Sequence, residues 1–114
     1  MRAHPRVFFA GQISGVEGYV EAIATGLMAG IHAATFAAGN AVRPLARETA
    51  LGSLCHYISG ADPKNYQPAN ITFDLLPQLD EPTRQALRRD KHARHAEVCR
   101  RAQSALAEWV AAHA

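Results

Sequence analysis

The sequence predicts an α/β fold that is mostly helical in this chain, with one short strand, a glycine-rich loop and three helices. The leading observation is an apolar run at residues 6–10 that passes through a glycine-rich loop into a long apolar helix. Two further helical stretches follow, separated by segments rich in proline and other turn formers. Apolar residues make up 48% of the chain, which is ordinary for a globular protein and argues against general disorder.

The first elements are a strand and the helix that follows the loop. Residues 6–10 carry apolar side chains without alternation, as in a strand that is covered on both faces. Residues 19–38 are predicted to form a helix, which Gly39 and Asn40 end as a C-cap. An aliphatic ridge runs along this helix, and a second face consists of small residues that would permit close packing. The ridge comprises Ile23, Leu27 and Ile31, and the small-residue face comprises Ala22, Gly26, Gly30 and Ala33.

The second half should contain two more helices and an extended segment. Thr49 can N-cap a helix over residues 50–58. Residues 61–79 contain three prolines and should run extended, and residues 71–73 could form another short strand. Asp80 can cap a single final helix of about thirty residues. The apolar stripe of that helix consists of Val98, Ala102, Ala105, Leu106 and Trp109.

Basic residues gather on the final helix, although the net charge of the whole chain is only +2. Seven of the twelve basic residues lie between positions 84 and 101, and only Asp90 and Glu97 oppose them there. They could contact RNA phosphates, with an affinity that falls as salt rises, or form a solubilising surface. Both interpretations stay open, and the residues are Arg84, Arg88, Arg89, Lys91, Arg94, Arg100 and Arg101.

Composition also bears on compartment and membrane association. The N-terminus shows no signal-peptide pattern, and two cysteines, Cys55 and Cys99, fit a reducing cytosol. Residues 20–38 are long enough to span a membrane, but they are rich in Ala and Gly and include His32. We therefore expect a cytoplasmic protein with no membrane association.

Three histidine and cysteine side chains near the C-terminus have a spacing that could suit a metal. Offsets of three and four place His92, His95 and Cys99 on one face of a helix, where they could hold zinc. A fourth ligand is not evident, so we expect a solvated helix surface and no metal site. His56, beside Cys55, is expected to be a partly buried helix residue.

The glycine-rich loop at residues 11–18 is the strongest candidate for a ligand site. Glycine lacks Cβ, so a ligand can approach the main chain closely, and the N–H groups at a helix start face that ligand. A plain strand-to-helix turn is the alternative. Glu17 and Glu21 would repel a phosphate and suit a neutral ring better. Gln12 could bond either such a ring or the loop backbone.

The sequence GQISGVEGYVEAIATGLMAGIHAA at residues 11–34 closely resembles the last flavin-contacting motif of the folate-dependent tRNA (uracil-5-)-methyltransferases, the TrmFO family. The resemblance extends over roughly residues 5–80, with several separate motifs in family order. The further motifs lie at residues 49–52, 57–58, 61–64, 66–73 and 75–77. The chain departs from the family pattern at Ala69, Thr72 and Asp74, which puts a ligand role for that segment in doubt.

The resemblance implies that this chain is the C-terminal part of a Rossmann-like FAD-binding domain. Residues 1–60 would complete that domain, and residues 61–114 would add an extended segment and a basic helix packed on it. The implied flavin-contacting residues are Gly11, Gln12, Ile13, Gly15, Glu17, Gly18 and Tyr19. The G-x-G-x-x-G fingerprint and the catalytic cysteines of similar enzymes are not found here, so we assign no catalytic residue and expect a fragment of a longer enzyme.

The implied activity is formation of 5-methyluridine in the tRNA T-loop. Methylenetetrahydrofolate would donate the carbon, NAD(P)H would reduce the FAD, and the partners would be tRNA and folate with no stable protein partner. The fragment alone should be inactive and should not retain FAD. A GidA-type tRNA-modifying flavoprotein is an alternative, although Val16 and Glu17 favour the first family. A second alternative is a non-catalytic helical fragment that binds RNA through its basic helix.

Overall fold

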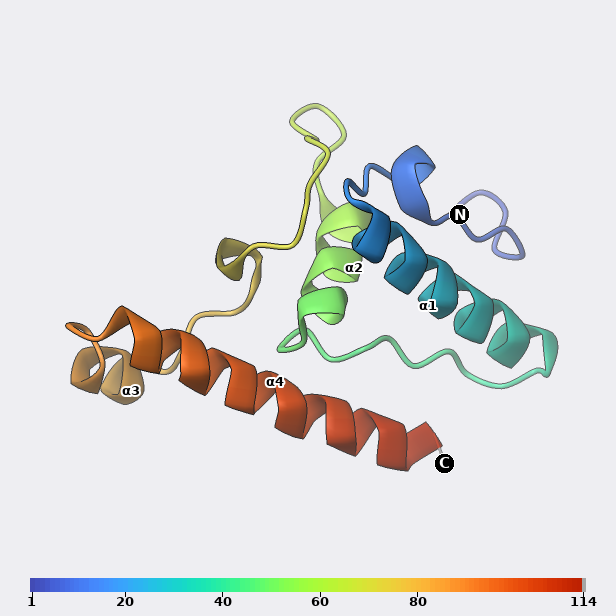
Figure 1. The fold of residues 1–114 in the computed structure, drawn as a ribbon. Coiled ribbons are helices and arrows are strands. Elements are labelled where there is room, and N and C mark those ends of the chain that lie inside the picture. The colour runs from blue at the N-terminus through green and yellow to red at the C-terminus, as the bar shows by residue number, and fades with distance from the viewer. Residues whose placement is uncertain (114) are drawn as a thin grey trace.

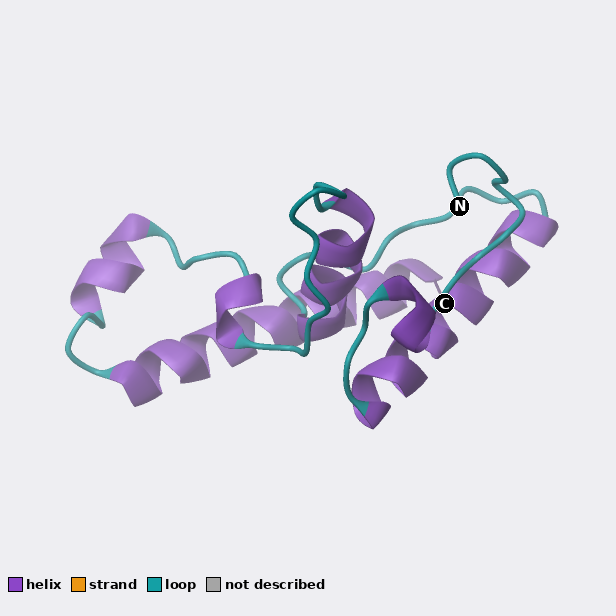
Figure 2. Ribbon diagram, turned by 90° about the horizontal axis from the view of Figure 1, so that it is seen from above, coloured by secondary structure: helices purple, strands orange, loops and turns teal. Residues whose placement is uncertain are grey.

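Four α-helices and two short 3₁₀ helices form the chain in a computed structural model that describes residues 1–113 (Figures 1 and 2). The elements in order are η1 (Gly11–Ser14), α1 (Tyr19–Ala37), α2 (Ala50–Gly60), η2 (Phe73–Leu75), α3 (Glu81–Ala86) and α4 (Lys91–His113). The prediction of a mostly helical chain is confirmed. The Rossmann-like domain to which it would belong stays a prediction.

The predicted strand at residues 6–10 is wrong. Within residues 1–113 the structure contains no strand, only an isolated parallel bridge between Val16 and Ala69. Ala10 does have extended backbone angles, and Val7 and Phe9 are exposed. A strand requires a neighbouring strand, whereas Val7 bonds locally. Its N–H donates to the His4 carbonyl at 2.9 Å, and its carbonyl accepts from the Met1 amine at 2.6 Å. The possible strand at 71–73 is also wrong, because η2 begins at Phe73.

The predicted caps of α1 and α2 are confirmed. Gly39 is left-handed (φ 75°), and its N–H donates to the carbonyl of Phe36 while Asn40 N–H donates to Thr35, which is a Schellman motif. Thr49 Oγ1 accepts from Gly52 N at 2.9 Å and caps α2. Helix α2 continues to Gly60, two residues beyond the predicted end at residue 58.

The single final helix predicted after Asp80 is instead two helices. Asp80 does cap α3 by accepting from Thr83 N, but α3 is short and a turn at residues 87–90 follows it. The Asp90 carboxylate accepts from Ala93 N at 2.9 Å and begins α4. Asp favours N-caps over helix interiors because its carboxylate bonds the free N–H groups of a first turn. Asp90 therefore explains the break.

Helix α4 lies apart from α1 (Figure 1). Three of its side chains contact segments of the chain that precede α3. His95 stacks on Phe73 with ring centroids 3.8 Å apart. Arg101 donates to the carbonyls of Pro77 and Gln78, the latter at 2.9 Å. Trp109 Nε1 donates to the carbonyl of Pro44 at 3.1 Å. These ties fix α4 against the η2 segment and the α1–α2 linker.

The core is small for a chain of this length. Its buried apolar side chains are Val16, Met28 and Leu54, where the loop, α1 and α2 meet. The accessible surface is 8040 Å², against about 6,100 Å² for a typical folded monomer of this mass. The radius of gyration is 15.5 Å, against about 13 Å for a typical domain of this length. The chain therefore leaves an unusual share of its apolar surface open.

Helix α1 contributes much of that open surface. It is long and apolar enough to cross a membrane by length and composition alone, and only 11% of its most apolar stretch is buried in this chain. The same property is common in core helices of larger soluble proteins, so it does not by itself identify the surroundings of α1.

Removing the Thr49 hydroxyl should destabilise α2. Thr49 is buried, and its Oγ1 both accepts from Gly52 N and donates to the Ala46 carbonyl. Thr49→Ala should lower the unfolding free energy by about 1 kcal/mol, measured by urea unfolding with circular dichroism. Thr49→Ser keeps the hydroxyl and is the control. Equal losses in the two variants would mean that the methyl group, not the cap, stabilises this corner.

Candidate functional site

The loop between Ala10 and α1 adopts a fixed path set by three left-handed glycines. Gly11, Gly15 and Gly18 have φ values of 70°, 83° and 91°. Between the first two, η1 makes one tight turn that the Ser14 hydroxyl closes by donating to the Gly11 carbonyl at 2.7 Å. Gly18 is the N-cap of α1. The loop thus leads from Ala10 into the start of α1 through three residues whose positive φ values favour glycine.

Residues 66–71 brace this loop from the side. Glu17 N–H donates to the Ala69 carbonyl at 3.0 Å, and Ala69 N–H donates to the Gly15 carbonyl at 2.9 Å. The Tyr66 hydroxyl donates to the Ser14 carbonyl at 2.5 Å. Ile71 N lies 3.4 Å from Glu21 Oε1. Two segments about fifty residues apart in sequence are joined by these bonds.

The Tyr66 brace should hold across neutral and moderately alkaline pH. Burial raises the pKa of the Tyr66 phenol, and Tyr57, which stacks on it, adds to the rise. A group whose folded pKa is raised stabilises the fold fully below its ordinary pKa, and that contribution disappears as the pH rises through the raised value. The hydroxyl therefore remains a donor to Ser14 under physiological conditions.

Contacts within the chain account for two of the glycines. A Cβ at Gly15 would lie 2.0 Å from the Tyr66 hydroxyl oxygen, and one at Gly18 would lie 2.2 Å from Glu21 Oε2. The sequence interpretation attributed the absence of Cβ to an approaching ligand. In the structure Tyr66 and Glu21 occupy that space, so the glycines alone are not evidence for a ligand.

Gly11 is the least accessible of the seven predicted flavin-contacting residues. It is buried, and its N–H donates to Thr25 Oγ1 at 3.2 Å. Its carbonyl accepts from Val16 N and from the Ser14 hydroxyl. Gly11 therefore acts within the chain as a support for the loop, and a direct contact with a cofactor stays a prediction.

The other predicted flavin-contacting residues are exposed to solvent, except that Gly15 is half-buried. Gln12, Glu17 and Gly18 are exposed, as are Ile13 (77%) and Tyr19 (91%). No side chain caps α1, and within residues 1–113 no acceptor receives the N–H groups of Tyr19, Val20 or Glu21. An uncapped start of a long helix carries partial positive charge. This corner can accept an electron-rich group.

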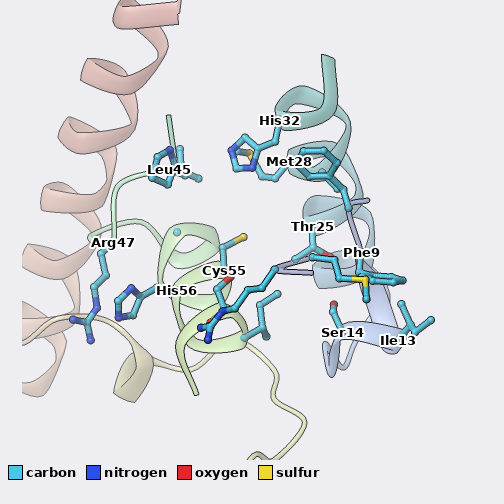
Figure 3. A pocket seen from close by; sticks show the side chains of 18 residues that line it. Phe9, Ile13, Ser14, Thr25, Met28, His32, Leu45, Arg47, Cys55 and His56 are labelled. Carbon is cyan, nitrogen blue, oxygen red and sulfur yellow. The ribbon is translucent and has the colours of Figure 1, made fainter. Parts of the chain in front are cut away.

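A cavity of about 810 Å³ opens beside the loop, between the N-terminal segment, α1 and α2 (Figure 3). Ile13 and Ser14 of the loop reach it, together with Met28 and His32 of α1. Burial lowers the pKa of His32, and its Nε2 is buried without a hydrogen-bond partner in the described part of the chain. The lowered pKa favours the uncharged form of His32, whose own Nε2 is available to a group that enters the cavity.

The cavity also contains the two residues of α2 that the sequence singled out. Cys55 and His56 line it, on the side opposite Met28 and His32 (Figure 3). Burial raises the pKa of the Cys55 thiol, so it stays protonated near neutral pH. A protonated, half-buried thiol is a poor nucleophile, which fits a packing role.

The candidate metal residues do not form a site among residues 1–113, where no three His, Cys, Asp or Glu side chains gather for a metal. His95 is engaged by its stack on Phe73. Cys99 is exposed on α4. The ring contact with Phe73 gives His95 a structural role.

Several side chains of the basic cluster are already engaged in ion pairs or hydrogen bonds within the chain. Arg84 pairs with Glu81, Arg100 pairs with Glu97, and Arg101 bonds the carbonyls of Pro77 and Gln78. Arg94 donates to the Arg88 carbonyl. Three cations with no side-chain partner among residues 1–113 lie at the α3–α4 turn, and they are Arg88, Arg89 and Lys91.

Sequence reasoning missed Tyr66 and Thr25 as supports of the loop. Thr25 is buried on α1 and accepts from Gly11 N. A Thr in the middle of an apolar helix is a usable signal, because a buried hydroxyl needs partners. No local signal in the sequence links Tyr66 to Gly15.

Comparison with known proteins gives two results. A family model described as "Glucose inhibited division protein A" matches residues 1–41. Proteins named "Methylenetetrahydrofolate--tRNA-(uracil-5-)-methyltransferase TrmFO" match nearly the whole chain. That of Solibacter usitatus is 76% identical over 109 residues, which cover 96% of this chain and 24% of that protein.

Two further relatives with the same name agree. That of Koribacter versatilis is 59% identical over 111 residues, covering 97% of this chain and 25% of the relative. That of Symbiobacterium thermophilum is 50% identical over 112 residues, which cover 98% of this chain and 24% of the relative. The chain thus spans about a quarter of the length of the curated relatives it matches.

Replacing Gly15 should disrupt the loop through Tyr66. Gly15→Ala places a Cβ on the Tyr66 phenol at a left-handed residue, which should cost about 1–3 kcal/mol in urea unfolding. Gly60→Ala is the control, because a Cβ there meets open space. In a Tyr66→Ala background the Gly15→Ala loss should shrink. An unchanged loss would mean that backbone strain alone, not the Tyr66 contact, requires glycine.

Proposed function

This chain belongs to the TrmFO family, of whose members it spans about a quarter, and we propose that it acts as part of an FAD-dependent tRNA methyltransferase. The proposed enzyme forms 5-methyluridine in the tRNA T-loop, with methylenetetrahydrofolate as carbon donor and NAD(P)H as reductant of the flavin. It works in the cytoplasm. Other parts of the enzyme supply the catalytic residues, and this chain supplies one wall of the flavin site.

The uncapped start of α1 is the observation that carries this proposal. The N–H groups of Tyr19, Val20 and Glu21 are free within residues 1–113, and the brace by residues 66–71 holds them in place. FAD, when bound, supplies the electron transfer. The free N–H groups at the start of α1 could donate hydrogen bonds to the carbonyl oxygens of an adjacent flavin ring.

The side chains around this corner fit a ring better than a phosphate. Gln12 can donate or accept a hydrogen bond, and the exposed Ile13 and Tyr19 offer apolar contact. Glu17 is exposed and would repel a phosphate, whereas Glu21 is turned toward Gly18 and Ile71. The proposed contact surface consists of Gln12, Ile13, Gly15, Glu17, Gly18 and Tyr19, and Gly11 supports the loop that carries it.

A GidA-type flavoprotein is the second candidate, favoured by the family model over residues 1–41. The relatives named TrmFO cover nearly the whole chain, including the segment that braces the loop, and so support the first candidate. The third candidate is a helical RNA-binding fragment without flavin, which rests on the cations at the α3–α4 turn. The three candidates differ in whether flavin is bound and in which uridine, if any, is modified.

The proposal can be tested by grafting this chain into a full-length relative. The chain replaces the matched segment of the Solibacter usitatus protein, which is 76% identical to it. The graft should copurify with FAD and form 5-methyluridine in unmodified tRNA when methylenetetrahydrofolate and NAD(P)H are supplied. The isolated chain should be colourless and inactive. A graft that folds and binds FAD but modifies a different uridine would favour the GidA-type function.

The free cations at the α3–α4 turn should contribute to tRNA binding. In the graft, Arg88→Ala, Arg89→Ala and Lys91→Ala together should weaken tRNA binding and flatten its salt dependence, by roughly one unit of log–log slope for each phosphate that the protein no longer neutralises. Arg89→Ala alone should weaken binding more than Arg100→Ala, which removes the same charge from a residue paired with Glu97. An unchanged slope in the triple variant would assign tRNA binding to other parts of the enzyme.

A further inference from the structure

The outward face of α1 is apolar along its whole length. Every exposed position of this helix is occupied by an apolar or small residue, and none carries a charge. The largest are Ile23 and Leu27, which are 73% and 63% exposed, next to Tyr19 and Val20 at the helix start. The full set is Tyr19, Val20, Ile23, Gly26, Leu27, Gly30, Ala34, Phe36 and Ala37. An apolar face of this extent marks a surface that another structure covers.

No contact among residues 1–113 explains the two glycines on this face, Gly26 and Gly30. A Cβ at Gly26 or Gly30 would meet nothing within 4 Å, and neither residue has a left-handed backbone. Glycine in a helix interior is unfavourable relative to alanine, so these positions should have a reason outside the described residues. Glycines one turn apart leave a shallow groove that allows another backbone to approach closely.

The size of the chain indicates what covers the face. Its three buried apolar side chains make a small core, and its accessible surface of 8040 Å² exceeds the amount typical of a monomer of its mass. The chain also spans only about a quarter of its relatives' length. A polypeptide that supplies the rest of such a fold would have to contact this chain, and the outward face of α1 is a long apolar surface available for that contact.

We propose that the outward face of α1 is the surface against which the rest of the TrmFO fold packs. Ile23 and Leu27 insert into that partner, and Gly26 and Gly30 are the points of closest approach. The inference rests on the family membership from which the proposed function starts. It assigns the long apolar helix to a protein interface and not to a membrane.

Lipid is the less suitable occupant because only one side of α1 is free. The opposite side carries η1 and packs toward α2, with Thr25 and Met28 buried there. If α1 crossed a membrane, the glycine-rich loop and η1 that pack on it would have to enter the bilayer, where unpaired backbone groups are costly. One apolar side opposite a packed side is the pattern of a helix at a protein interface.

The test compares the same variants in two settings, the isolated chain and the full-length graft. Gly26→Leu with Gly30→Leu should raise the helix content of the isolated chain by circular dichroism, because leucine is the better helix former. In the graft the same pair should lower the melting temperature by several degrees, because it fills the groove. Opposite signs in the two settings are expected only if the rest of the fold covers this face.

A charge on the ridge provides an independent variant. Ile23→Glu should leave the isolated chain nearly unchanged but should strongly lower the melting temperature of the graft or prevent its soluble expression. Val110→Glu is the matched control, since Val110 is exposed on α4, and it should change neither. Equal small effects of Ile23→Glu and Val110→Glu in the graft would overturn the proposal.

Two other outcomes would also overturn it by naming another occupant. The first is that both the isolated chain and the graft sediment as dimers and that Ile23→Glu dissociates these dimers. The other is binding of the graft to phosphatidylcholine vesicles through α1. Bound flavin is measured by absorbance in the same graft preparations. A graft that lacks flavin but shows the predicted shifts would reject the flavin site and leave the docking surface in place.

Discussion

The short backbone pairing across Val16 and Ala69 is the interaction on which most of the structure depends. Through it, residues 66–71 fix the path of the loop, and the loop fixes where α1 starts. The same pairing places Tyr66 against Gly15 and lets Tyr57 of α2 stack on Tyr66. With so few apolar side chains buried, the chain relies on directed backbone hydrogen bonds more than on a large apolar core.

Local chemistry made the helix ends predictable from the sequence. Thr49 and Asp80 have side chains that bond the free N–H groups of a first turn, and Gly39 can take the left-handed conformation that ends α1. The strand at residues 6–10 could not be predicted correctly from the same sequence, because a strand is defined by its neighbour. The final helix broke at Asp90 because a cap residue inside a helical pattern can start a new helix.

The candidate site was predicted less completely than the fold. The loop and the start of α1 lie where the sequence placed them, and Gln12, Ile13, Glu17 and Tyr19 are exposed as a ligand site requires. The contacts that hold the loop involve Tyr66, far away in the sequence, so no local pattern could reveal them. The basic cluster was overestimated because charges in a sequence do not show which are already paired.

The three ties of α4 limit how the length of this chain can change. His95, Arg101 and Trp109 project from one side of the helix, and each contacts a different segment of the chain. Inserting one residue in an α-helix turns everything beyond it by about 100° and moves it by about 1.5 Å. A single insertion or deletion between these residues would therefore detach one tie, whereas a substitution would leave the spacing intact. Homologues should accordingly vary in the composition of α4 far more readily than in the number of residues that separate its anchors.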